Sequence, residues 1–299
     1  MIEELLGTVL RTMTPILLAA LGGLISERLG VFNIALEGKM LFGAFFSIYG
    51  TFLTGNPMIG TLFGVVVGGF IGFLFVTLVE KYKAEPIITA IGVNTLALGV
   101  TTFAMKETFG DLGSIQSNIK GFSKLDIPIL RDIPFVNTVL NGHTPLTYIS
   151  LILVVILSFI IYRTYIGINL RAVGEKPEAA EATGVSVIKY RTIGVCMTGV
   201  LCGLAGAHLA LGYVTMFTEG MTAGRGFFAY AAVLFGKTDP FIVFVASGIF
   251  GFAESISLRA QQFGFPSSLV LMMPYIITIL ALSIRYKRVK KRTKNLLAR

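Results

Sequence analysis

Residues 167–182, Gly167-Ile-Asn-Leu-Arg-Ala-Val-Gly-Glu-Lys-Pro-Glu-Ala-Ala-Glu-Ala, guide the interpretation of the whole chain. The stretch is polar and rich in small residues, and Thr183-Gly184-Val185 follow it. It lies between two long apolar runs, at 146–163 and 192–213. Alanine and glutamate are good helix formers. We therefore expect a short charged helix that stays in water between two segments built for lipid.

The composition is that of a protein that crosses a membrane many times. Hydrophobic residues make up 54% of the 299 residues and charged residues only 14%, whereas a soluble domain has about 25% charged residues. Apolar runs near 20 residues long recur throughout, and each could cross about 30 Å of hydrocarbon. Because no water is present there to satisfy backbone groups, these runs are expected to be helices.

The sequence predicts one all-α transmembrane bundle over 1–299, with eight to ten spans. The expected spans are 5–26, 31–53, 58–79, 86–106, 146–163, 192–213, 227–237, 240–258 and 266–285. The seventh span is short, which indicates a half-helix or part of a re-entrant hairpin near 214–237.

Charge sets the expected orientation. Most Lys and Arg residues lie in short loops, including 164–191, and in the tail 286–299. Positive loops stay inside, so this loop, the tail and the C-terminus are expected to be cytoplasmic. The 107–145 segment balances acids against bases and is expected to be an external loop, long enough to be functional. The net charge of +9 is not a nucleic-acid signal, and the basic tail would also suit anionic lipid.

Polar side chains inside apolar runs are candidates for a solute pathway, because they are costly in hydrocarbon. Asn33 and Glu37 lie four residues apart and would share one face of a continuous helix. Ordinary hydrogen bonding between helices is the alternative for each candidate. Uncharged Asn and Thr would suit a neutral polar solute, and the 24 Phe residues offer stacking faces for a ring. The candidate pathway residues are Asn33, Glu37, Asn94, Thr95 and Glu254.

Two glycine patterns have structural meaning. In the third span, glycine recurs at every fourth position from Gly60 to Gly72, which predicts close helix packing. The glycine-rich break at 218–228 surrounds a single arginine, which is typical of a structured loop buried in protein. The residues expected to shape that loop are Gly220, Thr222, Gly224, Arg225 and Gly226.

Catalysis and cofactor binding have little support. The two histidines, His143 and His208, are far apart in sequence, and no His, Cys or carboxylate group has metal-ligand spacing. The stretch Ala231-Ala-Val-Leu-Phe-Gly236-Lys237-Thr238 only superficially matches a phosphate loop, because four apolar residues precede Gly236. If transport uses ATP, another polypeptide must bind it.

Four segments carry a resemblance to a known family. They are Ser26-Glu-Arg-Leu-Gly-Val-Phe-Asn-Ile-Ala-Leu-Glu-Gly38, Leu170-Arg-Ala-Val-Gly-Glu-Lys-Pro-Glu-Ala-Ala-Glu-Ala-Thr-Gly184, Gly220-Met-Thr-Ala-Gly-Arg-Gly-Phe-Phe228 and Phe250-Gly-Phe-Ala-Glu254. With these segments the chain resembles the permease subunits of ABC importers for nucleosides and simple sugars, within the ribose and branched-chain amino acid permease group. Lys39 and Phe32 depart from the commoner residues of the first segment.

The resemblance implies import by alternating access in the plasma membrane of a bacterium. It implies that the 167–184 stretch is a coupling helix that docks on an ABC ATPase, which would bind ATP and Mg. The resemblance also implies a second permease subunit and an external substrate-binding lipoprotein. In the nucleoside branch the second subunit is often a different chain, which gives a heterodimer, and a homodimer of two identical chains is the alternative. The coupling residues would be Arg171, Gly174, Glu175, Pro177, Glu178, Ala179, Ala180, Glu181 and Gly184.

Within this reading a purine nucleoside is the expected solute, and a simple sugar such as a pentose is the alternative. A stand-alone secondary transporter is the rival class. It would need ion-coupling carboxylates and often has inverted repeats, but only Glu37 and Glu254 lie deep in apolar runs. A docking helix at 167–184 would serve no purpose in such a protein.

Overall fold

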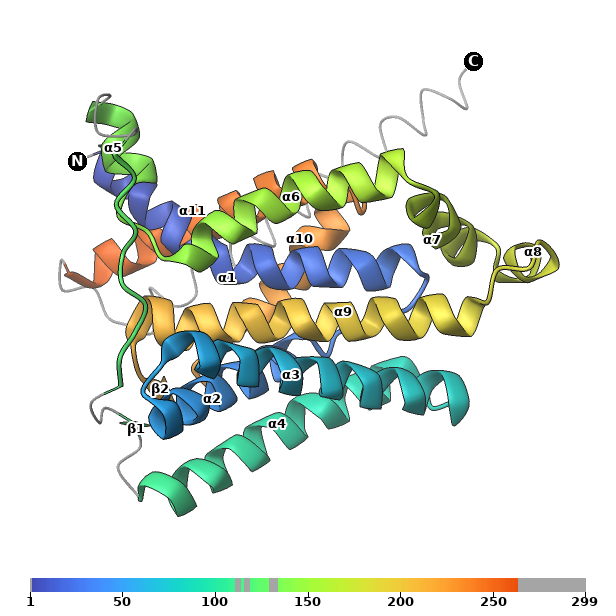
Figure 1. Cartoon of the computed structure of the whole chain (residues 1–299), viewed down its shortest axis with the longest axis horizontal. Helices are drawn as coiled ribbons and strands as arrows, with labels where there is room; N and C mark the ends of the chain where they lie inside the picture. Colours follow the sequence, from blue (N-terminus) through green and yellow to red (C-terminus); the bar gives the residue numbers. More distant parts are fainter. Residues whose placement is uncertain (1, 111–113, 116–118, 129–133, 263–299) are drawn as a thin grey trace.

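A computed structural model describes residues 2–110, 114–115, 119–128 and 134–262 of the chain. The long helices lie side by side along the long axis of the molecule (Figure 1). The first half contains α1 (Ile2–Arg28), α2 (Leu36–Thr54), α3 (Pro57–Val76) with a π-helical end (Thr77–Lys81), α4 (Pro86–Phe109), β1 (Ser114–Ile115) and α5 (Pro134–Leu140). The second half contains α6 (Pro145–Arg163), α7 (Tyr165–Glu175), α8 (Pro177–Ala182), α9 (Val187–Ala207) with a π-helical end (His208–Val214), β2 (Phe217–Thr218), α10 (Arg225–Gly236) and α11 (Pro240–Gln262).

The predicted all-α bundle is confirmed. Six helices in the described residues are long and apolar enough to cross a membrane: Glu3–Arg28, Pro57–Lys81, Pro86–Phe109, Pro145–Arg163, Val187–Val214 and Pro240–Gln261. They match six of the nine expected spans. The expected span 227–237 corresponds to the short helix α10, and 266–285 lies outside the described residues.

The expected span 31–53 is wrong at its start. Residues 29–35 are not helical, and α2 begins only at Leu36. Gly30 has φ +71°, a left-handed conformation that ends α1 and that a residue with a Cβ rarely adopts. Asn33 and Glu37 therefore do not share a helix face.

Proline marks the start of several helices. Pro57, Pro86, Pro145 and Pro177 each occupy one of the first two helical positions. Proline suits this position because the missing N–H would have no helical partner there. These local signals explain why most expected boundaries fall within a few residues of those observed.

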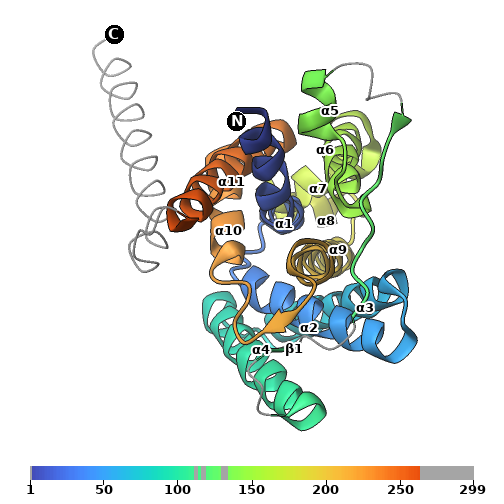
Figure 2. The same cartoon turned by 90° about the vertical axis from the view of Figure 1, so that its left-hand side faces the viewer.

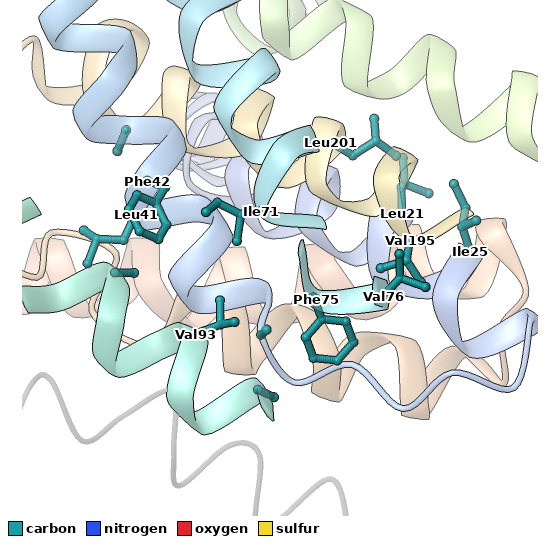
Figure 3. Packing of buried hydrophobic residues seen from close by; sticks show 14 of the residues in the cluster. Leu21, Ile25, Leu41, Phe42, Ile71, Phe75, Val76, Val93, Val195 and Leu201 are labelled. Carbon is teal, nitrogen blue, oxygen red and sulfur yellow. The ribbon is translucent and has the colours of Figure 1, made fainter. Parts of the chain in front are cut away.

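Helix α1 is the central element of the bundle. Figure 2 shows it between α11 and α9, with α4 at the outer edge. In the most apolar window of α1, 78% of residues are buried, against 22% in α4. The core around α1, α2, α3 and α9 is apolar (Figure 3), with Leu21 and Ile25 near Val195. The outer helices instead expose apolar side chains, which suits lipid contact.

The glycine spacing of α3 produces the expected close packing. A Cβ added at Gly68 would clash with the carbonyl oxygen of Gly199 on α9, and one at Gly72 would lie 2.6 Å from the oxygen of Val195. A Cβ added at Gly203 would likewise lie 2.5 Å from the carbonyl oxygen of Gly64. We refer to Gly64, Gly68, Gly72, Gly199 and Gly203 as the glycine seam. Its backbones approach closely because neither helix has a side chain between them.

The described parts of the expected external loop, 107–145, lie at the end of the bundle opposite α7 and α8 (Figure 1). Strand β1 pairs antiparallel with β2, which joins this segment to the stretch before α10. The backbone N–H of Phe122 donates to Leu211 O, in the π-helical end of α9, at 3.0 Å. These contacts hold the described parts of the segment against the bundle.

Candidate functional site

The break between α1 and α2 contains a buried polar network. The hydroxyl groups of Ser26 and Thr198 lie 2.7 Å apart, and Asn33 Nδ2 donates to Ser26 Oγ at 3.2 Å. Asn33 Oδ1 accepts from the backbone N–H of Ala35 at 3.3 Å. Asn33 is only 1% exposed. Its side chain therefore replaces helical hydrogen bonds that this segment does not make.

Lys39 completes that network. Its Nζ donates to Asn33 Oδ1 at 3.0 Å and lies 4.5 Å from the centroid of the Phe75 ring. The side chain is fully buried. Hydrogen bonding and the aromatic face both stabilise a buried ammonium group. Sequence reasoning noted Lys39 only as a departure from a motif, because its contact with Asn33 depends on how the chain turns at 29–35.

Glu37 stabilises the start of α10. Its two carboxylate oxygens accept from the backbone N–H groups of Gly224 at 2.8 Å and Gly226 at 2.6 Å. A helix N-terminus has unpaired N–H groups and a partial positive charge, so a carboxylate is favoured there. Gly224 has φ +84°, and a Cβ at Gly226 would lie 2.5 Å from Glu37 Cα. The glycines of this loop thus allow the close approach.

Asn94 has the same role at the start of α2. Its Oδ1 accepts from the N–H of Gly38 at 2.8 Å, and its Nδ2 donates to Ile34 O at 3.4 Å. A side chain from α4 therefore satisfies backbone groups on both sides of the helix start. Thr95 differs, because it is exposed on α4 and its hydroxyl donates to Ile91 O in its own helix.

Arg225 and Glu254 form an ion pair between α10 and α11. Arg225 Nε lies 3.0 Å from Glu254 Oε1, and Nη2 contacts the same oxygen. Arg225 Nη1 also donates to the backbone oxygens of Met221 and Thr222, at 3.0 and 3.2 Å. The two charged side chains are only 15% and 12% exposed. One arginine thereby fixes the loop that Gly220, Gly224 and buried Thr222 shape, as a structured loop requires.

The N-termini of α2 and α10 thus meet inside the bundle. Helix α10 has 12 residues, or about 18 Å, and the carbonyl oxygen of Thr238 just beyond it accepts from Arg28 Nε at the end of α1. The start of α10 therefore lies inward from that end by at most about 18 Å. Broken helices at such a depth are a recurring form of transporter sites. Among the described residues, no group of three or more His, Cys, Asp or Glu side chains could hold a metal ion.

Helices α7 and α8 form a pair at one end of the molecule (Figure 1). Pro177 separates them, because the residue before proline is disfavoured in helix, and Lys176 has φ −145° and ψ 85°. The single short charged helix expected within 167–182 is therefore divided between two helices, α7 and α8. Glu175, Glu178 and Glu181 are exposed, as are Ala179 and Gly184, whereas Ala180 is buried and Arg171 and Pro177 are half-buried.

Gly174 joins this helical pair to the broken helix. A Cβ at this position would clash with the carbonyl oxygen of Arg28, and the Gly174 oxygen lies 3.2 Å from the position of a Cβ at Gly30. Arg191 Nε also donates to Leu29 O at 3.3 Å. The end of α7 therefore packs directly on the break that leads to Asn33 and Glu37.

Comparison with known proteins assigns the family. Residues 5–282 match the branched-chain amino acid transport system permease component. The chain is 36% identical to the guanosine ABC transporter permease protein NupQ of Bacillus subtilis, over 90% of this chain and 88% of the relative. It is 30% identical to the nucleoside ABC transporter permease protein NupC of Lactococcus lactis, over 95% and 92%.

A third relative has a different name. The chain is 36% identical to a putative glucose ABC transporter permease protein, TsgC13, of Haloferax volcanii, over 86% of this chain and 78% of the relative. The two bacteria with nucleoside-named relatives each have a second matching permease, NupP at 28% identity and NupB at 27%. No solved structure matches the chain significantly.

The matched region covers nearly the whole helical bundle, including the α1–α2 break, the start of α10 and the α7–α8 pair. The relatives are transport subunits and not enzymes. The chain belongs to the branched-chain amino acid transport system permease family and is a multi-pass membrane permease component of an ABC transporter.

Proposed function

We propose that this chain imports a nucleoside, with a purine nucleoside as the preferred solute. The observation that carries the proposal is the extensive similarity to permeases named for guanosine and for nucleosides, each over at least 90% of this chain. ATP and Mg would bind to a separate ATPase subunit, and import would proceed by alternating access.

The chemistry near the break is compatible with that solute. Phe32 is 37% exposed, and its ring meets the edge of Tyr230 with centroids 5.4 Å apart. An exposed aromatic face can stack on a base. The nearby charged groups Glu27, Glu37 and Lys39 each already have a hydrogen-bond partner within the protein. What remains for a solute is therefore aromatic and uncharged.

The α7–α8 pair would transmit the ATPase motion. Its exposed glutamates offer an acidic docking surface, and Gly174 contacts the α1–α2 break directly. A displacement of α7 would press on residues 28–30 and so reach Asn33 and Glu37. In this mechanism, the ATPase displaces the α1–α2 break through α7, without contacting the break itself.

The remaining partners follow from the same proposal. The paired relatives support a second, different permease subunit, with a homodimer as the alternative. A substrate-binding lipoprotein would dock at the end that contains α5 and the β1–β2 pair. The α7–α8 end and the C-terminus would then face the cytoplasm.

Uptake measurements test the solute. The complete transporter, expressed in a bacterium that lacks nucleoside uptake, should accumulate labelled guanosine, and excess adenosine should compete more strongly than glucose or ribose. The glucose-named relative supports the alternative of a simple sugar. Accumulation of labelled glucose or ribose, unaffected by guanosine, would replace the proposal with that alternative.

Labelling tests the orientation. Lys176 is exposed between α7 and α8, so a cysteine in its place should react with a membrane-impermeant maleimide only in inside-out vesicles. A cysteine replacing exposed Thr54 at the opposite end should react only in intact cells. The reverse pattern would invert the proposed topology.

A further inference from the structure

A cavity opens beside α7 that the transport mechanism does not use. Its volume is about 620 Å³, and it lies between α1, α6, α7 and α9. Figure 1 shows α6 and α9 leading toward the end where α7 lies. The rim is apolar and open, with Ile193 54% and Met197 44% exposed. Such a rim would face hydrocarbon in a membrane.

The lining is divided along the helices. Leu157 on α6, and Ile193 and Met197 on α9, line the part of the cavity that lies farther from α7. The polar lining residues gather at the other end, near the end of α6 and the start of α9, and include Asn169 and Lys189. From Lys189 to Met197 the distance along the helix is about 12 Å. The cavity thus has a polar entrance at the level of α7 and, farther from α7, an apolar part that is open to the surroundings.

The polar end is arranged as a headgroup site would be. Asn169 Nδ2 donates to the hydroxyl of Tyr190 at 2.8 Å, which fixes two polar side chains at the entrance. Lys189 is exposed and forms no ion pair with any residue that the structure describes. Tyrosine and lysine at this level are typical of the membrane interface, and basic pockets between transmembrane helices suit anionic headgroups.

A second cavity on the molecule provides a contrast. It measures about 410 Å³ and lies between α2 and α3, lined by residues that include Phe46, Leu62 and Val66. None of its lining residues is charged. That surface can accept any acyl chain, whereas the cavity beside α7 combines an apolar part with one cation at the correct end.

We propose that the cavity between α1, α6, α7 and α9 binds one anionic phospholipid, with an acyl chain against Ile193 and Met197 and the phosphate beside Lys189. The lipid would fill the space between α7 and α9, so that part of the support of the α7–α8 pair comes from the membrane. The proposal rests on the membrane-spanning fold and not on which solute is carried.

Native mass spectrometry of the purified transporter complex tests this site. The complex is held in mild detergent with equal amounts of phosphatidylglycerol and phosphatidylcholine that have the same acyl chains. Wild type should retain at least one lipid, with phosphatidylglycerol preferred about fivefold, since one lysine near a lipid surface contributes about 1 kcal/mol.

Two variants separate the headgroup from the chain. Lys189→Gln should retain the same number of lipids but lose the preference for phosphatidylglycerol. Met197→Trp should lose one lipid altogether, because the indole fills the apolar part of the cavity, and Ile193→Trp is an independent variant with the same expectation. All three positions are exposed, so folding should be preserved.

Matched controls use the rest of the chain. Val66→Trp fills the uncharged cavity, and Lys237→Gln removes an exposed lysine between α10 and α11. Both should leave the selective lipid in place. The proposal is overturned if both tryptophan variants retain as many lipids as wild type, or if Lys189→Gln keeps the full phosphatidylglycerol preference.

Discussion

The α1–α2 break together with the start of α10, which we call the broken-helix junction, and the α7–α8 pair are both rich in charged residues, yet they use them in opposite ways. At the junction, Glu37 accepts from two backbone N–H groups and Arg225 pairs with Glu254. In the α7–α8 pair, the side chains of Glu175, Glu178 and Glu181 make no ion pair or hydrogen bond with the residues that the structure describes. Partnered charges hold backbone ends in place, and unpartnered charges are available to another subunit.

Breaking the ion pair should have the largest effect on stability. Arg225→Leu leaves Glu254 mostly buried without its partner, which typically costs about 3–5 kcal/mol. The variant is expected to unfold at a much lower denaturant concentration in detergent than wild type. A denaturant titration in which unfolding is monitored by helix content would measure the difference in stability.

The double variant Arg225→Leu/Glu254→Leu is the control, because it removes the uncompensated carboxylate. It should recover much of the lost stability. If it is no more stable than the single variant, hydrogen bonds from Arg225 to Met221 and Thr222, and not the ion pair, dominate at this position.

The glycine seam should respond next. Gly68→Ala introduces a methyl group against the carbonyl oxygen of Gly199, and such overpacking typically costs about 1–3 kcal/mol. The matched control is Gly92→Ala on α4, where nothing lies within 4 Å of the new Cβ. Thermal melting of the two variants measures the difference in their stability. Equal melting temperatures would show that the two helices of the seam can move apart without loss of stability.

The seam also shows what local sequence can predict. Glycine at every fourth residue predicted a smooth face on α3, because periodicity within one helix is a local property. The opposing glycines at 199 and 203 were not identified, since only the fold brings α9 against that face. The apolar spans were predictable for the same reason, and the family resemblance added the proposed coupling role of the α7–α8 stretch.

The break at 29–35 shows where local reasoning fails. A helix was predicted from 31 because the residues are apolar, but Asn94, more than 50 positions away, supplies the bond that lets α2 begin at Leu36. The same long-range contact gives Asn94 a structural role in addition to its predicted place in the pathway. Hydrogen-bond partners of buried polar side chains cannot be assigned from the spacing of residues alone.

Removing that bond should have a moderate effect. Asn94→Ala leaves the buried N–H of Gly38 without its partner, which costs about 1–3 kcal/mol. Uptake should fall while the complex still assembles with its partner subunits. Thr95→Ala is the neighbouring control, and its exposed hydroxyl bonds only within α4. Wild-type uptake kinetics in Asn94→Ala would remove this residue from both the pathway and the support of the break.

The α7–α8 pair should show the smallest change in stability and a large change in function. Glu178→Lys alters an exposed side chain, so the free energy of unfolding should move by no more than about 0.5 kcal/mol. Uptake should nevertheless fall strongly and ATP hydrolysis should no longer respond to solute, because the acidic surface proposed to meet the ATPase has been reversed. Glu175→Lys should behave alike.

Lys237→Glu is the charge-reversal control, since it also changes an exposed residue in a turn at the same end of the bundle. It should leave coupling intact. Normal uptake in both glutamate variants would contradict the docking role of this surface. A loss of uptake accompanied by a lower melting temperature would instead place Glu178 with the partnered charges of the junction, and the contrast between the two regions would no longer hold.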